Sequence, residues 1–157
     1  MSAIEIKATL SLSAVFFLRM LPLFMLLPVL SLTGDSYQAS TPQLLGIALG
    51  IYGLTQASLQ IPFGMLSDRF GRKPIICLGL VIFIIGSLIA AMSDSIYGLI
   101  LGRAIQGAGA IAAAIMALAA DLSTEQHRTK VMACIGISIG ISSVSYTHLR
   151  AHETRGN

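Results

Sequence analysis

Long apolar stretches separated by short polar gaps run along most of the chain. Four of these stretches, residues 8–30, 43–66, 74–92 and 96–120, reach or nearly reach the roughly 20 residues that a helix needs to cross the bilayer core. We therefore expect four transmembrane helices. A fifth apolar segment, residues 131–144, is too short to span and predicts only the start of another helix.

The first apolar stretch has an alternative interpretation as a secretory signal peptide. The apolar region of a signal peptide is about 7–15 residues long, whereas residues 8–30 are longer and contain Arg19, Pro22 and Pro28. These features favour a transmembrane helix.

Residues 145–157 break the apolar pattern. They hold two of the three histidines and two arginines, at the point where the fifth helix should still be crossing lipid. We expect this tail to be foreign to the fold, as after a frameshift or a vector join, with a native tail as the alternative.

The composition supports an all-α membrane protein. Hydrophobic residues make up 55% of the chain and charged residues 11%, against roughly 45–50% and about 25% in soluble domains. The net charge is +3, but the cations lie in short gaps between apolar runs instead of on one face. This distribution indicates a lipid bilayer as partner and argues against nucleic acid.

The cations also predict the orientation. Loops 67–73 and 121–130 contain five Lys or Arg residues, and the gaps at 31–42 and 93–95 contain none. Positive loops stay on the cytoplasmic side, so we expect the N-terminus and both basic loops to face the cytoplasm of a multi-pass inner-membrane protein. Cys77 and Cys134 follow these loops, and no disulfide is expected in that reducing compartment.

Small residues recur along the second predicted helix. Gly46 and Gly50 are four residues apart, as are Gly53 and Ala57. This spacing lets helix backbones approach closely and predicts helix packing.

Polar side chains also recur on this helix. Tyr52, Gln56 and Gln60 follow one another at intervals of four residues, so they share one side. Amides facing lipid are costly, and we expect this side to line an aqueous cavity or to form interhelical hydrogen bonds.

Two arginines fall inside the predicted helices. Arg103 shares a helical face with Gln106 and Gly107, and with Ala110 and Ala114 further on. Its guanidinium keeps its proton, and burial costs at least about 2.5 kcal/mol, so it must meet water, a carbonyl or a partner helix. Snorkelling to the outer surface is the alternative. Arg19, in the middle of residues 8–30, is expected at a ligand site or between helices.

The four predicted spans contain no Asp or Glu. A proton-coupled transporter usually has a titratable group within the membrane, so coupling would need a group elsewhere, such as Asp35 or Asp121 at the rims. The cysteines and histidines lack metal-ligand spacing, and no nucleophile–base pair or phosphate loop is present. We expect neither an enzyme nor a bound metal or cofactor.

Two motifs resemble those of the major facilitator superfamily of transporters. The first lies between the second and third helices and resembles motif A: Gly64, Asp68, Arg69, Gly71, Arg72 and Lys73. The second lies in the fourth helix and resembles motif B: Leu99, Arg103, Gln106, Gly107, Gly109 and Ala110. The amino-acid sequences of the first, second and fourth helices are similar to those of the YajR-like branch of bacterial drug–proton antiporters.

The resemblance implies a partial N-terminal half of a twelve-helix bundle that works by alternating access. The missing C-terminal half of the same chain would be a partner, with a small-molecule substrate between the halves. Proton-coupled efflux of drug-like molecules is the expected function, with the proton gradient as energy source. The antiporter motif of the fifth helix lies beyond the apolar segment. A sugar or metabolite carrier of the same superfamily, or a four-helix scaffold or sensor, are the alternatives.

The resemblance also implies residue roles. Gly64 and Asp68 would meet a helix of the other half, and Asp68 would lie at its N-terminus, where the helix dipole favours an anion. Arg72 would pair with Asp121, so that these residues form a conformational latch. Arg103 would take part in proton transfer. Orientation charge alone is the alternative role of the basic residues in the first motif.

The predicted orientation can be tested at Cys77. We expect slow labelling by a membrane-impermeant thiol reagent in right-side-out vesicles, because the start of the third helix faces the cytoplasm. Fast labelling from outside would show that the topology is wrong.

Overall fold

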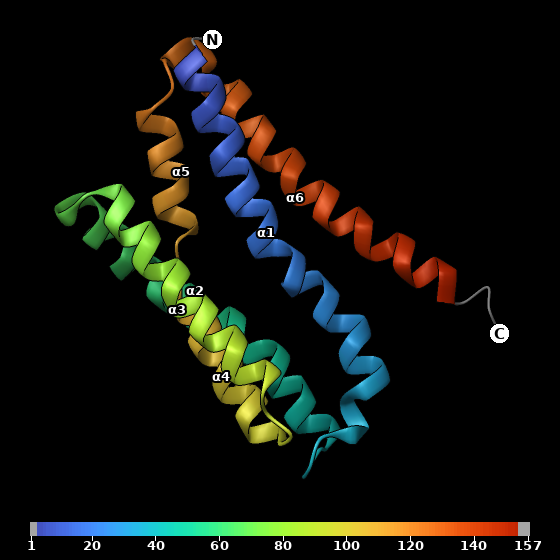
Figure 1. The fold of residues 1–157 in the computed structure, drawn as a ribbon. Helices are drawn as coiled ribbons and strands as arrows, with labels where there is room; N and C mark the ends of the chain where they lie inside the picture. The colour runs from blue at the N-terminus through green and yellow to red at the C-terminus, as the bar shows by residue number, and fades with distance from the viewer. Residues whose placement is uncertain (1–2, 154–157) are drawn as a thin grey trace. The chain divides into compact units, whose positions relative to one another are not determined.

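The computed structural model describes the backbone of residues 3–153 and most of their side chains, except those of residues 4–5, 21–29, 31–32, 35, 142–143 and 145–153. The elements in order are α1 (Ala3–Thr33), a 3-10 turn (Gly34–Ser36), α2 (Pro42–Phe70), α3 (Arg72–Ala91), α4 (Ile96–Ala108), α5 (Ala112–Asp121) and α6 (Glu125–Glu153) (Figure 1). No strand occurs in this described part, and the predicted all-α fold class is confirmed.

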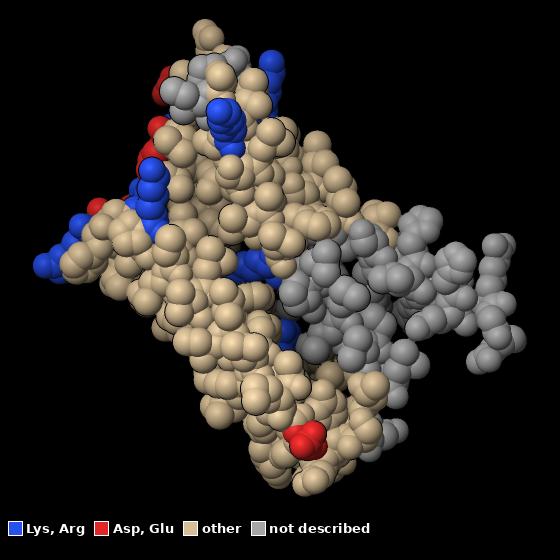
Figure 2. Space-filling model, in the orientation of Figure 1, with Lys and Arg blue, Asp and Glu red and all other residues tan. Residues whose placement is uncertain are grey.

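The helices form two compact units. The first contains Met1–Ser31 and Met116–Asn157, and the second contains Leu32–Ile115. Among the residues that the structure describes, three segments are long and apolar enough to cross a membrane: Pro42–Phe70, Arg72–Ala91 and Ile96–Asp121. Figure 2 shows the same contrast on the surface, where broad uncharged areas separate small groups of Lys and Arg.

The first unit holds α1 and α6. Thr9 and Leu12 of α1 line a small hollow together with Leu122 and Val131, so the N-terminal half of α1 lies beside the start of α6. Val131 is 2% exposed and belongs to the core of this unit.

Helix α6 differs from the predicted segment 131–144. It begins at Glu125, where Thr124 accepts hydrogen bonds at its carbonyl from the backbone N–H groups of His127 and Arg128, both at 2.9 Å. It also continues to Glu153, so the polar tail is helical as far as the structure describes it. The foreign origin of residues 145–157 stays a prediction.

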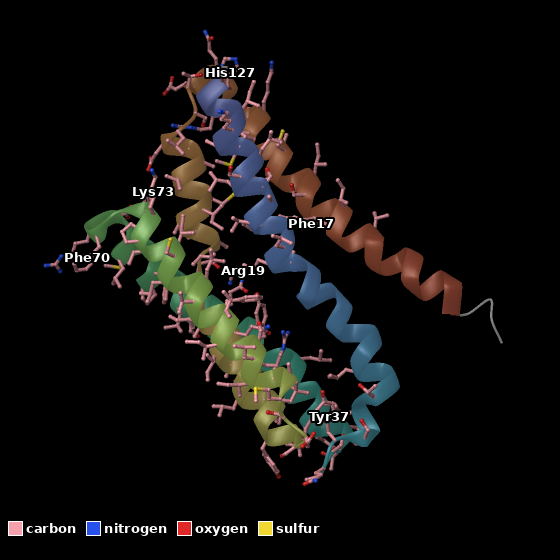
Figure 3. The ribbon with its side chains drawn as sticks, viewed as in Figure 1. Phe17, Arg19, Tyr37, Phe70, Lys73 and His127 are labelled. Atoms are coloured by element: carbon pink, nitrogen blue, oxygen red, sulfur yellow. The ribbon has the colours of Figure 1, made fainter. Side chains whose placement is uncertain are left out.

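In the second unit, a single residue joins α2 to α3. Gly71 has a φ of 99°. This conformation favours glycine, because the Cβ of any other residue would clash with the backbone. Phe70 and Lys73 lie at this turn, and Tyr37 lies at the opposite end of the unit (Figure 3). The turn places motif A at one end of an α2–α3 hairpin.

The opposite end is tied together by backbone hydrogen bonds. The Gln38 N–H donates to the Asp94 carbonyl at 2.9 Å, and the Ile96 N–H donates to the Gln38 carbonyl at 3.2 Å. Side chains start both following helices, since Thr41 accepts from the Leu44 N–H and Ser95 from the Tyr97 N–H. The beginnings of α2 and α4 are therefore held side by side.

Helix α4 packs on both α2 and α3, and glycines set its distance from α3. A methyl group at Gly86 would lie 2.7 Å from the Gly102 carbonyl oxygen, and one at Gly102 would lie 2.6 Å from the Ala90 nitrogen. Such distances are too short for a real side chain. The two helices therefore approach as closely as their backbones allow.

Within the second unit, the α2 glycines do not take the predicted packing role. Apart from the adjoining residues of α2 itself, no heavy atom of the described residues lies within 4 Å of a Cβ placed at Gly46, Gly50 or Gly53. The close contacts use glycines of α3 and α4 instead, because those faces are turned toward each other.

The span predicted at 96–120 agrees with the apolar segment Ile96–Asp121, but its helix is interrupted between α4 and α5. The Ala110 N–H donates to the Ala108 carbonyl at 2.8 Å, and the Ile111 N–H to the Gly109 carbonyl at 2.9 Å. These two-residue spacings are those of tight γ-type turns. Gly109 packs against the Gly79 carbonyl and Phe83 of α3, so the interruption is buried.

The α3–α4 contact generates a stability prediction. Gly86→Ala should lower the free energy of unfolding of the purified chain in detergent by about 1–3 kcal/mol, because the added methyl group overpacks a backbone contact. Gly50→Ala is the matched control, and it should be neutral or stabilising by up to about 1 kcal/mol because alanine favours the helix. Equal effects of the two changes, measured by circular dichroism during unfolding, would contradict this packing.

Candidate functional site: a buried arginine network and a charged turn

The side chain of Arg103 is buried in the second unit. It is 2% exposed, so the snorkelling alternative is wrong. Its Cζ atom lies 4.5 Å from the centre of the Tyr52 ring, which is a cation–π contact between α4 and α2. The structure thus brings together two residues that the sequence placed on separate helices.

Two further hydrogen bonds extend this contact to α3. Arg103 Nη1 donates to Gln106 Oε1, one helical turn further along α4. Gln106 Nε2 donates to Ser87 Oγ at 2.7 Å, and Ser87 Oγ donates to the Phe83 carbonyl. We call Tyr52, Ser87, Arg103 and Gln106 the arginine network. It joins α2, α3 and α4.

Gly107 allows the network to form. A side chain at this position would collide with the Tyr52 carbonyl oxygen and with Thr55. The glycine therefore lets α4 approach α2 closely enough for Arg103 to reach the Tyr52 ring. The expected common face is confirmed for Arg103, Gln106 and Gly107, which are all buried on α4, whereas Ala110 and Ala114 lie beyond the end of this helix.

Ser87 was not identified from the sequence. It is the one hydroxyl-bearing residue in residues 74–92, an otherwise almost wholly apolar stretch. A lone hydroxyl in such a helix needs a hydrogen-bond partner, and this signal could have marked it.

The other predicted cavity residues lie near the network or outside the unit. Gln56 and Gln60 are half-buried on α2, and Gln56 Oε1 has no hydrogen-bond partner among the described residues. Tyr52 is 4% exposed. Arg19 belongs to the first unit, where its side chain is 2% exposed (Figure 3).

The charged turn of motif A is organised by Arg72. Its Nη1 atom donates to Ser67 Oγ at 2.9 Å and pairs with the carboxylate of Asp68. Ser67 Oγ in turn donates to the Gly64 carbonyl at 2.7 Å. Ser67 is 1% exposed and was not identified from the sequence.

The remaining motif A residues lie around this turn. Arg69 and Lys73 are exposed, and Arg69 lies 5.7 Å from the centre of the Phe70 ring. Asp121 belongs to the first unit, so its pairing with Arg72 stays a prediction.

Comparison with known proteins identifies the family. The sequence profile of the Major Facilitator Superfamily matches residues 12–146, which is most of the chain. The chain belongs to the Major Facilitator Superfamily. Membership makes it an integral, multi-pass membrane protein, in agreement with its apolar helices.

Several members of the superfamily resemble this chain. The inner membrane transport protein YajR of Escherichia coli is 63% identical over 138 residues, which cover 88% of this chain and 30% of YajR. An uncharacterised transporter of Buchnera aphidicola is 54% identical over 142 residues, covering 90% of this chain and 36% of that protein. The class B tetracycline resistance protein of Escherichia coli is 33% identical over 101 residues, covering 64% and 25% of the two chains. The chain spans about a third of the length of the first two relatives.

The hydrogen bond between Ser87 and Gln106 can be measured by a double-mutant cycle. With Ser87→Ala and Gln106→Leu, we expect a coupling energy of about 0.6 kcal/mol and at most about 1.7 kcal/mol, the range for hydrogen bonds between membrane helices. The measurement is unfolding of the chain in mixed micelles with increasing denaturing detergent.

The control cycle pairs Ser87→Ala with Gln60→Leu, which lies outside the network. These two changes should add within about 0.5 kcal/mol. Equal coupling in the two cycles would mean that Ser87 does not hold Gln106.

Proposed function

We propose that this chain forms the N-terminal part of a transporter that exports small drug-like molecules across the inner membrane by alternating access, driven by the proton gradient. The arginine network is the observation that carries the proposal, because it places a fixed charge among apolar helices of a superfamily member. The names of two relatives support it further, one an inner membrane transport protein and the other a tetracycline resistance protein.

Arg103 is suited to a role in proton coupling. A buried cation stabilises the negatively charged form of any acid that comes close to it, and therefore favours release of that acid's proton. The network holds the guanidinium from two sides, with the Tyr52 ring on its face and Gln106 at Nη1. A charge fixed in this way acts only on groups that move past it, as alternating access requires.

The charged turn is suited to the role of a latch. Gly71 allows a one-residue connection, and Arg72 binds both Ser67 and Asp68, so the turn is internally tied. Asp68 is 64% exposed at its side chain and can still meet another helix. We propose that it contacts the N-terminus of a helix in the other half, where the helix dipole attracts an anion.

The latch is tested in a full-length transporter that contains this chain. Asp68→Asn should abolish export of a fluorescent drug such as ethidium driven by a pH gradient, because it removes the charge that attracts the helix end and binds Arg72. Insertion into the membrane should stay unchanged, as measured by the amount of transporter in the membrane fraction.

The matched control is Glu125→Gln, which neutralises an exposed acid at the start of α6. It should export ethidium at the wild-type rate. Wild-type export by Asp68→Asn would defeat the latch, and loss of export in both variants would assign the effect to net charge alone.

A further inference from the structure

We propose that Arg103 and Tyr52 form a binding site for a carboxylate group, and that the transported molecules include apolar carboxylic acids in their anionic form. The inference rests on the proposed function only in treating the carboxylate as part of a transported molecule. The binding site itself follows from the contacts of two buried side chains.

One edge of the Arg103 guanidinium has no hydrogen-bond partner among the described residues. Among the described residues, its hydrogen bonding is limited to the bond from Nη1 to Gln106, and Nε is buried without a hydrogen bond. The face of the group is covered by the Tyr52 ring. The edge formed by Nε and Nη2 is therefore left, and it carries two parallel N–H donors.

The Tyr52 hydroxyl is a second donor, on the residue whose ring covers the guanidinium. It is buried and has no hydrogen-bond partner among the described residues, although the side chain is only 4% exposed. An unsatisfied buried hydroxyl and an unsatisfied buried N–H are each costly, and both are relieved by an acceptor between them. Two such groups, on residues that are themselves in contact, indicate a site for an oxygen-bearing ligand.

The charge balance selects an anion over a neutral acceptor. The acids of the second unit, Asp35, Asp68 and Asp94, all lie in the connections or at a helix end, and the membrane-spanning parts contain none. No ion pair joins Arg103 to a carboxylate among the described residues. A ligand that brings its own negative charge supplies what the unit lacks.

The geometry selects a carboxylate among anions. The guanidinium edge matches two coplanar oxygens in a bidentate pair, and Gln106, itself held by Ser87, fixes the rotation of the group. The buried side chains of this unit are largely apolar, including Leu99, Ala110 and Ile111, which precede and follow Arg103 in the sequence. A carboxylate on an apolar or aromatic body fits this environment.

The test is equilibrium binding of radiolabelled benzoate to the full-length transporter in lipid nanodiscs. We expect saturable binding that unlabelled benzoate displaces and benzamide, its neutral analogue of the same shape, does not. Arg103→Lys keeps the charge but loses the two-donor edge, and it should weaken binding at least about tenfold. Tyr52→Phe keeps the ring on the guanidinium and should weaken binding by about two- to tenfold.

The control is Arg128→Lys, the same change at an exposed cation outside the site, which should bind benzoate like the wild type. Displacement by benzamide as strong as by benzoate, or wild-type affinity in Arg103→Lys, would overturn the proposal. Absence of saturable benzoate binding would also overturn it, since the edge would then be covered by another part of the transporter. Benzoate binding without pH-driven export would leave this site standing and defeat the proposed function.

Discussion

The burial of one permanently charged guanidinium between apolar helices is the constraint on which the second unit depends. Placing an arginine in the membrane core costs at least about 2.5 kcal/mol. A desolvated cation–π contact stabilises the fold by about 2 kcal/mol, and a hydrogen bond to a charged group by about 1.5–3 kcal/mol. The contacts of Arg103 with Tyr52 and Gln106 are therefore of the size needed to offset the cost. Because Tyr52 belongs to α2 and Gln106 also binds Ser87 of α3, the network fixes α2, α3 and α4 against one another.

The glycines and the arginine network are two parts of one packing solution. Gln106 reaches Ser87 only because Gly86 and Gly102 let α3 and α4 approach at backbone distance. Gly107 does the same between α4 and the Tyr52 region of α2. Apolar side chains gain little from leaving lipid for a helix interface, so backbone approach and short hydrogen bonds have to supply the association. The positions of the glycines thus decide which polar groups can meet.

The sequence was sufficient for the helices and for one face of the site, but not for the contacts between helices. The apolar runs placed α2 and α3 within a few residues of their observed ends, and the spacing of Arg103 and Gln106 gave a common buried face. The spacing of the α2 glycines was misleading, because it shows that one helix face lacks large side chains but not which helix packs against that face. The interruption at Gly109 was missed because two glycines only weaken a helix, while contacts with Gly79 and Phe83 of α3 decide its path. Ser67 and Ser87 were missed because their roles depend on hydrogen bonds to Arg72 and Gln106, which the sequence alone does not reveal.

Helix α2 connects the charged turn with the arginine network. Tyr52 and Ser67 are fifteen residues apart on one uninterrupted helix, a separation of about 22 Å along its axis. Pro62 lies between them and removes one backbone hydrogen bond, so it is the point where this helix bends most easily. Because Gly71 alone joins α2 to α3, a shift of the turn displaces both helices together, and both carry a member of the network. The position of the guanidinium edge is therefore mechanically tied to the turn, which gives a latch at one end of the hairpin a physical route to a binding site in its middle.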